Sequence, residues 1–301
     1  MSLLFRFYSF LIVLAALLLN SVAFSAAAFE QTLNIPSARS SFDISHNYHK
    51  ILLLKALQAA NKNSNVSLVE ATVTMSQGRA IEELKKSTLD VYWLGTSQQL
   101  EADLLPIKIP TTRGLIGFRK FIIHKDSLEK FNRVNTISDL KGLSACQGTH
   151  WPDTQILRAA NLSVVTTPIY EDLFKMVNAK RCDYFPRGYH DVKTELNLRK
   201  GLYPNLISYD NILLQYPFAV YFFTNNKNTA LAKDIEKGLR LMAENSEIEQ
   251  LMTQHPLTSS IYPLHSEEHT VVIKLSNPLL PQVNNFSNKD YWILPSDFSS
   301  Q

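Results

Sequence analysis

Apolar and polar positions follow two different periods along the chain, and the changes of period outline a first structural unit. Short apolar runs predict strands, and stretches with apolar residues three and four apart predict helices. The expected elements are a strand at 31–35, a helix at 47–61, a strand at 67–74, a helix at 77–86 and a strand at 89–95. This β-α-β-α-β order is typical of a parallel sheet covered by helices.

The same order returns in a second unit. Three apolar runs alternate there with two helical patterns, and they lie at 143–147, 163–169 and 182–185. An extended apolar run at 114–124 leads into this unit, and after it the segment 207–214 precedes a buried strand expected at 216–224. The next stretch is amphipathic, which predicts a helix at 229–244 that continues at 248–252. From Pro256 onward Pro, Ser and Asn are frequent, which favours irregular packing over one lobe.

Two such units predict an α/β protein of two lobes joined by two crossing segments. Residues 114–117 would carry the chain out of the first lobe, and residues 215–218 would carry it back. We therefore expect lobe 1 to contain residues 29–113 and 217–301, and lobe 2 to contain residues 114–216. Paired crossings allow closure on a ligand by hinge motion, and open sheets of this kind bind ligands beyond the carboxyl ends of their strands.

The first 28 residues have the pattern of a cleavable signal peptide. Arg6 supplies the positive start, residues 10–19 form the apolar run, and Ala26-Ala27-Ala28 offers the cleavage site. The apolar run is too short for a confident membrane span. We expect export to a periplasm and a mature chain that begins near Phe29. An uncleaved anchor is the alternative.

Composition narrows the class of partner. The net charge is +3, and loss of Arg6 reduces it by one, so basic and acidic residues are nearly balanced. The chain has no basic block, which disfavours a nucleic-acid partner. The two cysteines, Cys146 and Cys182, fall on strands of one lobe, where a disulfide is chemically allowed. Because the two positions are slightly out of step, we expect two buried thiols rather than a bridge.

One resemblance rests on residues spread along the chain. They are the exported start and the pieces Leu33-Asn34-Ile35, Leu89-Asp90-Val91, 137–142, 147–149, Asp183 and 233–252. From about residue 31 to residue 252 the chain resembles an extracellular solute-binding protein of family 3, within an uncharacterised branch from Gram-negative bacteria. The resemblance implies a type II periplasmic-binding-protein fold with two hinge crossovers.

The sequence departs from the amino-acid-binding members of that family at both ends of their ligand. Those members usually carry an Arg after the third strand, but residues 96–101 contain none. They also usually carry an Asp after the strand of Asp183, where this chain has Phe185-Pro186-Arg187-Gly188. The resemblance therefore predicts the fold, and it does not predict capture of an α-amino acid.

Candidate ligand contacts in lobe 2 come from the ends of predicted strands. The backbone of Gly148 and the hydroxyl of Thr149 would favour an anion at a helix N-terminus, although Thr149 could simply cap the helix. Trp151 could wall the cleft or fill the core. Arg187 could bind a carboxylate or phosphate, or form a structural pair with Asp191 or Asp153. The list of candidate ligand contacts in both lobes is Thr96, Ser97, Arg119, Gly148, Thr149, Trp151, Asp153 and Arg187.

Lobe 1 and the outgoing crossover offer weaker candidates. Thr96 and Ser97 follow the third strand and could donate to a ligand or act as ordinary loop hydroxyls. Arg119 lies in the outgoing crossover and could reach the cleft or form a hinge salt bridge. His46 and His49 have a spacing that can hold a metal, but a solvated helix start is the preferred interpretation. Asp43 and His46 lie at the mouth of the first loop, where modest ligand contact is expected.

We expect no enzyme activity, no cofactor and no metal. The preferred function is capture of a small polar solute, including an anionic one, for transport or sensing. The partners would be a transporter's membrane subunits or a sensor, and the protein would be a monomer. The alternatives are a dehydratase-like enzyme that uses a cleft carboxylate, and a ligand-free interaction module. The candidate carboxylates are Glu101, Asp153, Glu171 and Asp183.

Overall fold

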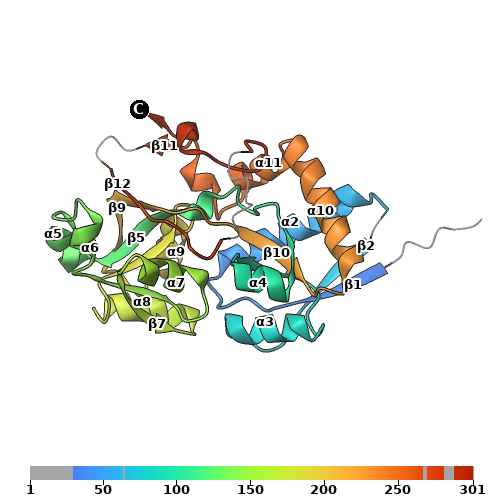
Figure 1. The fold of residues 1–301 in the computed structure, drawn as a ribbon, viewed down its shortest axis with the longest axis horizontal. Coiled ribbons are helices and arrows are strands. Elements are labelled where there is room, and N and C mark those ends of the chain that lie inside the picture. The colour runs from blue at the N-terminus through green and yellow to red at the C-terminus, as the bar shows by residue number, and fades with distance from the viewer. Residues whose placement is uncertain (1–29, 64, 267–269, 281–287, 301) are drawn as a thin grey trace, which may run out of the picture.

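The computed structural model describes residues 30–63, 65–266, 270–280 and 288–300, and in it the chain folds into two α/β lobes that lie side by side (Figure 1). The signal-peptide expectation falls on residues 1–28, which lie outside the described residues. Within the described part, none of the helices combines the length and the apolar character that crossing a membrane requires.

Lobe 1 is built from small sheets covered by helices. Its elements are β1 (Glu30–Ile35), α2 (Ile44–Ala60), β2 (Asn65–Glu70), α3 (Gln77–Lys85), β3 (Tyr92–Gly95), α4 (Gln98–Asp103), β4 (Leu105–Ile107), β10 (Val220–Thr224), α10 (Thr229–Glu244) and α11 (Glu247–Gln254). Strand β1 pairs with β2 in parallel, and β10 pairs antiparallel with both β3 and β4. The backbone of Asp90 donates to the Asn34 carbonyl at 2.8 Å, which joins these sheets.

Helices α2 and α10 form the centre of the lobe 1 core. Leu52, Leu53, Ile235 and Leu239 are fully buried between them and the sheets. The backbones approach so closely that a Cβ atom at Gly238 would lie 1.7 Å from the Ala56 carbonyl oxygen. Only glycine fits there, so this residue sets the distance between the two helices.

Lobe 2 contains the larger sheet. Its elements are β5 (Phe118–His124), α5 (Leu128–Phe131), α6 (Ile137–Leu140), β6 (Ser144–Gly148), α7 (Pro152–Ala159), β7 (Ser163–Thr167), α8 (Tyr170–Asn178), β8 (Tyr184–Gly188), α9 (Val192–Arg199) and β9 (Leu206–Gln215). Within the described residues the strand order is β12-β9-β5-β8-β6-β7, where β12 is Val271–Lys274. The strands β6, β7 and β8 are parallel, and β5 runs antiparallel to β8 and β9.

The two crossing segments lie together, as the sequence predicted. The Tyr216 amide donates to the Gly117 carbonyl at 3.0 Å, and a Cβ atom at Gly117 would lie 2.6 Å from the Tyr216 carbonyl oxygen. This contact places the two strands between the lobes side by side, where a hinge is required.

The tail differs from the expected irregular packing over lobe 1. Strand β12 (Val271–Lys274) pairs in parallel with β9, so this part of the tail extends the sheet of lobe 2. Assigning all of 217–301 to lobe 1 was therefore wrong at β12. Two short strands, β11 (His265–Ser266) and β13 (Ser299–Ser300), pair with each other in parallel and so join two separate parts of the tail. The apolar triplet Val271-Val272-Ile273 is the sequence signal for the added strand.

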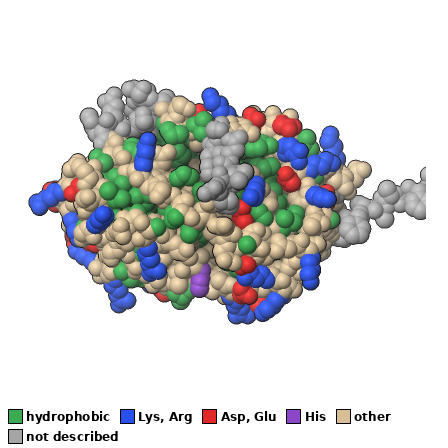
Figure 2. Space-filling view, in the orientation of Figure 1, with side chains coloured by type: hydrophobic (Ala, Val, Ile, Leu, Met, Phe, Trp, Pro, Cys, Tyr) green, Lys and Arg blue, Asp and Glu red, His purple; other side chains and the backbone are tan. Residues whose placement is uncertain are grey.

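Charged side chains are spread over the surface. On the face shown in Figure 2, Lys and Arg side chains are found on all sides of the view, some of them close together and near Asp and Glu side chains.

Candidate functional site

A cavity lies between the two lobes and receives residues from both. It encloses about 780 Å³, part of which is open to solvent. Its walls come from the loop after β1, the start of α2, the end of β3, the hinge segments, and the β5, α7 and β8 regions of lobe 2. The sequence predicted that a ligand would bind between the lobes. We call this cavity the cleft.

On the lobe 1 wall, an arginine that the sequence analysis did not select is paired with an aspartate. Arg39 donates to both carboxylate oxygens of Asp43, at 2.6 and 2.7 Å. Burial acts to raise the pKa of Asp43, but the charge and hydrogen bonds of Arg39 outweigh it and hold the pKa well below the usual range. The Arg39 guanidinium also lies 4.1 Å from the Tyr170 ring centroid, on lobe 2.

His46 and His49 are buried, which corrects the expected solvated helix start. Their exposed fractions are 6% and 4%. His49 stacks on Trp93 with ring centroids 5.1 Å apart, and its Nδ1 lies 2.7 Å from the Ser45 carbonyl oxygen. Burial lowers the pKa of His49 to about 3, so this ring is neutral near pH 7. Among the described residues, no group of three or more His, Cys, Asp or Glu side chains is arranged to hold a metal.

On the lobe 2 wall, Arg119 and Asp153 form a buried pair. An Arg119 amino group lies 2.5 Å from Asp153 Oδ1, and the Tyr216 hydroxyl donates to the same oxygen at 2.6 Å. Both charged residues line the cleft and are less than 5% exposed. Two roles were expected for Arg119, a contact in the cleft or a salt bridge at the hinge. Arg119 does line the cleft, and its salt bridge with Asp153 lies inside lobe 2 and does not span the hinge.

Arg187 also lines the cleft, but its fork is occupied by carboxylates. It donates to both oxygens of Glu195 at 2.8 and 2.7 Å, and it lies 3.0 Å from Asp191. The Tyr170 hydroxyl donates to Glu195 as well. The predicted strand ended at residue 185, before Arg187. Strand β8 instead runs from Tyr184 to Gly188, so Arg187 lies within it. The expected structural pair with Asp191 is thus present, and Asp153 pairs elsewhere.

Some polar atoms on the cleft wall have no hydrogen-bond partner among the described residues. One of them, His46 Nε2, lies 3.0 Å from Glu70 Oε2. The other three are Thr112 Oγ1, Arg119 Nε and His190 Nδ1. Their side chains are 2–3% exposed, so water does not reach them freely. Burying a polar group without a partner costs free energy. All three belong to residues that line one cavity, so the unpaired polar atoms are concentrated around the cleft.

Gly148 and Thr149 do not form the expected anion site. The Gly148 amide donates to Gln147 Oε1 at 3.3 Å, and the Thr149 amide donates to the Thr167 carbonyl at 3.0 Å. Both residues line a neighbouring cavity that shares Arg39, Gln77 and Trp151 with the cleft. The prediction of an anion site assumed that these two amides were free. The Gly148 amide is instead bonded to a side chain, and the Thr149 amide is bonded to the end of β7.

Trp151 lies on the wall of both cavities and packs into the lobe 2 core as well. Its ring stacks on Phe185 with centroids 6.2 Å apart, and the Arg187 guanidinium lies 5.3 Å from its centroid. A Cβ atom at Gly148 would lie 2.5 Å from this ring, so Gly148 is needed to seat the tryptophan.

Thr96 and Ser97 do not line the cleft, which corrects their selection. Thr96 is fully buried, and its hydroxyl donates to Glu101 at 2.7 Å. The Ser97 hydroxyl accepts from the Leu100 amide at 3.2 Å and caps α4. Gly95, one residue earlier, reaches the cleft instead.

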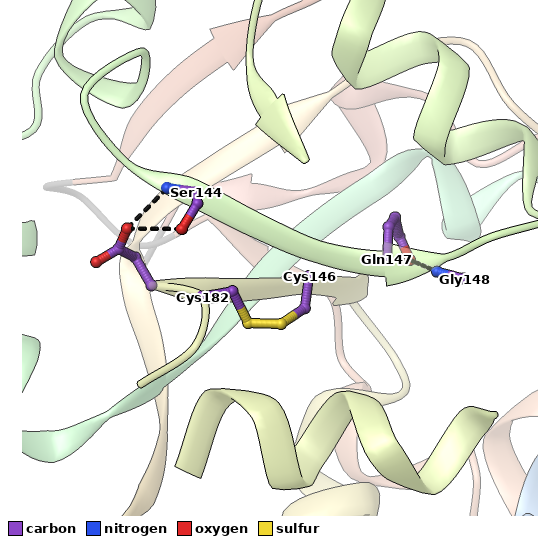
Figure 3. The surroundings of a disulfide bond; sticks show 6 residues. Ser144, Cys146, Gln147, Gly148 and Cys182 are labelled. Atoms are coloured by element: carbon purple, nitrogen blue, oxygen red, sulfur yellow. Dashed lines mark hydrogen bonds between the residues drawn. A yellow bond between two sulfur atoms is a disulfide. The ribbon is translucent and has the colours of Figure 1, made fainter. Parts of the chain in front are cut away.

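Cys146 and Cys182 form a disulfide, so the expected pair of free thiols was wrong. Their Cα atoms lie 5.6 Å apart, within the range that a bridge needs. Cys182 precedes β8 and is not held in the strand register that made the positions seem out of step. Figure 3 shows the bridge between Cys146 and Cys182, with Ser144 on the same strand as Cys146. Asp183 fixes its segment against β6, because its carboxylate accepts from the Ser144 amide at 2.7 Å and its amide donates to the Ser144 carbonyl at 2.8 Å.

The four carboxylates considered for catalysis are all engaged within the protein. Asp153 pairs with Arg119, and Asp183 with Ser144 and Lys130. Glu101 accepts from Thr96 and pairs with Lys108 at 2.6 Å, and Glu171 pairs with Arg199. The oxygens of these carboxylates are therefore already used in contacts within the protein.

Comparison with known proteins supports the fold. No family model matches the chain, and a search of curated proteins gives no match. Solved structures do match. An amino acid ABC transporter substrate-binding protein, AbpA from Streptococcus pneumoniae bound to L-arginine, has a TM-score of 0.56 and 12% identity over 76% of this chain and 95% of that one.

Other matching structures have different roles. A histidine kinase sensor domain with similarity to periplasmic binding proteins has a TM-score of 0.54 and 15% identity over 75% of this chain and 96% of that one. The ancestral amino acid-binding protein AncCDT-1, a precursor of cyclohexadienyl dehydratase, has a TM-score of 0.52 and 11% identity over 74% and 94%. At these identities the likeness establishes the fold, and the type II periplasmic-binding-protein architecture predicted from the sequence is confirmed.

Proposed function

We propose that this chain is an exported solute-binding protein that captures a small polar molecule in the cleft. The observation that carries this proposal is the set of polar atoms on Thr112, Arg119 and His190. All are buried, all belong to residues that line one cavity between the lobes, and none has a hydrogen-bond partner among the described residues. A bound molecule would supply the missing hydrogen bonds.

Direct contacts between the lobes support capture by closure. The Ser40 hydroxyl donates to Glu171 at 2.6 Å, and Gln77 donates to the His150 carbonyl at 2.9 Å. Ser40 and Gln77 belong to lobe 1, whereas His150 and Glu171 belong to lobe 2. Rotation about the paired hinge segments would break these contacts and open the cleft. Closure would then exclude water and strengthen each polar contact with the ligand.

Solved structures of the same fold support a proposal for the partner that recognises the closed state. One belongs to an ABC transporter and another to a histidine kinase sensor. We propose that the closed form of this protein docks on a transporter's membrane subunits or on a sensor in the periplasm. The signal-peptide pattern of residues 1–28 supports that compartment.

We propose binding without catalysis. The neighbour AncCDT-1 is described as a precursor of a dehydratase, so the scaffold can acquire chemistry. In this chain, however, the cleft aspartates Asp43, Asp153 and Asp191 each lie against an arginine, which disfavours a role as general base.

Native mass spectrometry of protein purified from its own periplasm tests this function. We expect a complex with one small molecule, which is released when the protein is unfolded. The Thr112→Val variant should carry less of it. Protein that holds no small molecule, and whose Tm is unchanged by a small-molecule extract of the same cells, would contradict the proposal.

A further inference from the structure

We propose that the cleft selects an uncharged solute that carries at least one oxygen able to accept a hydrogen bond. This inference rests on the proposed function, because it describes the ligand of the same cleft. It departs from the anionic ligand expected from the sequence and from the zwitterionic α-amino acids bound by proteins of this fold.

The charged side chains on the cleft wall balance one another. Among the described residues, three arginines and three aspartates line it, and each arginine lies against an aspartate of its own lobe: Arg39 with Asp43, Arg119 with Asp153, and Arg187 with Asp191. The wall histidines His46, His49 and His190 have pKa values lowered by burial, so they add no charge near neutral pH.

The residue behind the wall makes an anion still less favourable. Glu195 accepts both donors of the Arg187 fork and is 2% exposed. Arg187 is therefore shared between two carboxylates, and no guanidinium on the wall is left to neutralise a ligand carboxylate or phosphate. A charged ligand enclosed here would have to shed its water without gaining a counter-charge, which is costly in a buried site.

The polar atoms that lack partners set a second requirement on the ligand. Arg119 Nε carries a hydrogen and can only donate, so it requires an acceptor on the ligand. The Thr112 hydroxyl can donate or accept, and His190 Nδ1 takes either role according to the tautomer. A neutral molecule with hydroxyl, carbonyl or amide groups satisfies all these atoms. A simple amine without an acceptor would leave Arg119 Nε unpaired.

The experiment divides a small-molecule extract of the producing cells by charge. A cation exchanger at acidic pH removes amines and all amino acids, and an anion exchanger at alkaline pH removes carboxylates and phosphates. What neither resin retains is the uncharged pool. We expect this pool to raise the Tm of ligand-stripped protein as much as the whole extract does, whereas the eluted charged pools should leave it unchanged.

Stabilisation by either eluted pool, with none from the uncharged pool, would overturn the inference while leaving the proposed function intact. If neither the whole extract nor any pool shifts the Tm and no ligand co-purifies, the proposed function fails together with it. The two failures are thus distinguishable.

A charge variant gives a second measurement. Asp153→Asn removes the counter-charge of Arg119 and keeps an oxygen for the Tyr216 hydroxyl. The variant should gain stabilisation from the anionic pool that the unmodified protein lacks. If Asp153→Asn folds and its preference among the pools is the same as that of the unmodified protein, charge balance does not set selectivity, and the inference is wrong.

Discussion

The two walls of the cleft use polar residues in different ways. The lobe 2 wall is dominated by buried ion pairs around Arg119 and Arg187, which leave Arg119 Nε, and His190 Nδ1 beside them, without a partner among the described residues. On the lobe 1 wall, one ion pair, Arg39 with Asp43, lies beside the neutral ring of His49 and the Thr112 hydroxyl, which has no partner among the described residues. The difference teaches that a cation on a cleft wall need not be a ligand group. Charge there stabilises the lobe, and uncharged or spare polar atoms remain for recognition.

The largest expected effect comes from breaking the ion pairs of the lobe 2 wall. Arg187→Gln leaves Asp191 and Glu195 buried without their shared cation, so we expect a loss of about 3–5 kcal/mol in the free energy of unfolding at neutral pH. Urea denaturation of ligand-free protein measures it. The exposed pair of Arg240 and Glu236 is the control, and Arg240→Gln should cost less than about 0.5 kcal/mol.

If Arg187→Gln instead keeps the stability of the ligand-free protein and weakens solute binding, Arg187 is a ligand residue, and the contrast between the two walls disappears. The sequence had left both roles open. Its bidentate contact with Glu195 is the structural reason to expect a loss of stability.

The next effect concerns the disulfide that closes a long loop within lobe 2. Cys146 and Cys182 are 36 residues apart, so chain entropy predicts a stabilisation of about 3–4 kcal/mol. Equilibrium denaturation with and without a reductant should show this difference. A Cys146→Ala, Cys182→Ala double variant should not respond to the reductant. Equal stability of the oxidised and reduced proteins would show that the bridge contributes nothing.

A smaller effect separates two neighbouring threonines of the lobe 1 wall. Thr112 Oγ1 has no partner among the described residues, whereas the Thr111 hydroxyl lies 3.0 Å from His49 Nε2 and donates to the Val220 carbonyl. Thr112→Val should weaken solute binding about tenfold to a hundredfold without loss of stability in the ligand-free protein. Thr111→Val should instead lower stability by about 1–3 kcal/mol. Calorimetry with the co-purified solute, together with urea denaturation, tests both; the reverse pattern would contradict the site.

The last effect is a dependence of stability on pH, and it is modest for each single pH unit. Burial holds the pKa of His49 at about 3 in the folded protein, below the value of about 6.5 in the unfolded chain. The unfolded state therefore binds more protons between these values, and stability falls as the pH drops through that window. One such histidine contributes a slope of about 1.4 kcal/mol per pH unit. His49→Gln should show a shallower slope, and an unchanged slope would show that His49 does not titrate in this way.

Much of the fold could be predicted, because the spacing of apolar residues along the sequence distinguishes its strands from its helices. The two β-α-β-α-β units and the paired crossings follow directly from runs such as 143–147 and 163–169. Strand β12 could not be placed, because three apolar residues in a polar tail do not show which sheet they will extend. Cys182 could not be paired with confidence, because its distance from Cys146 depends on the turn that Asp183 fixes against Ser144.

Less of the site could be predicted. Arg119, Trp151, Asp153 and Arg187 were selected from their positions near strand ends or at the crossing, and all line the cleft. Arg39 and Thr112 were missed because they lie in loops without a motif, and His190 because nothing in its local sequence distinguishes it. Whether a polar atom is free depends on tertiary neighbours. Adjacent Thr111 and Thr112, with the same chemistry, show that the sequence carries no such signal.

A crystal structure of the protein with its co-purified solute tests the central claim most directly. The account predicts an uncharged molecule in the cleft, with polar atoms within hydrogen-bond distance of Thr112 Oγ1, Arg119 Nε and His190 Nδ1, and with the pair of Arg187 and Glu195 intact. A ligand bound instead beside Gly148 and Thr149 in the neighbouring cavity, or one whose anionic group displaces Glu195 from Arg187, would contradict it.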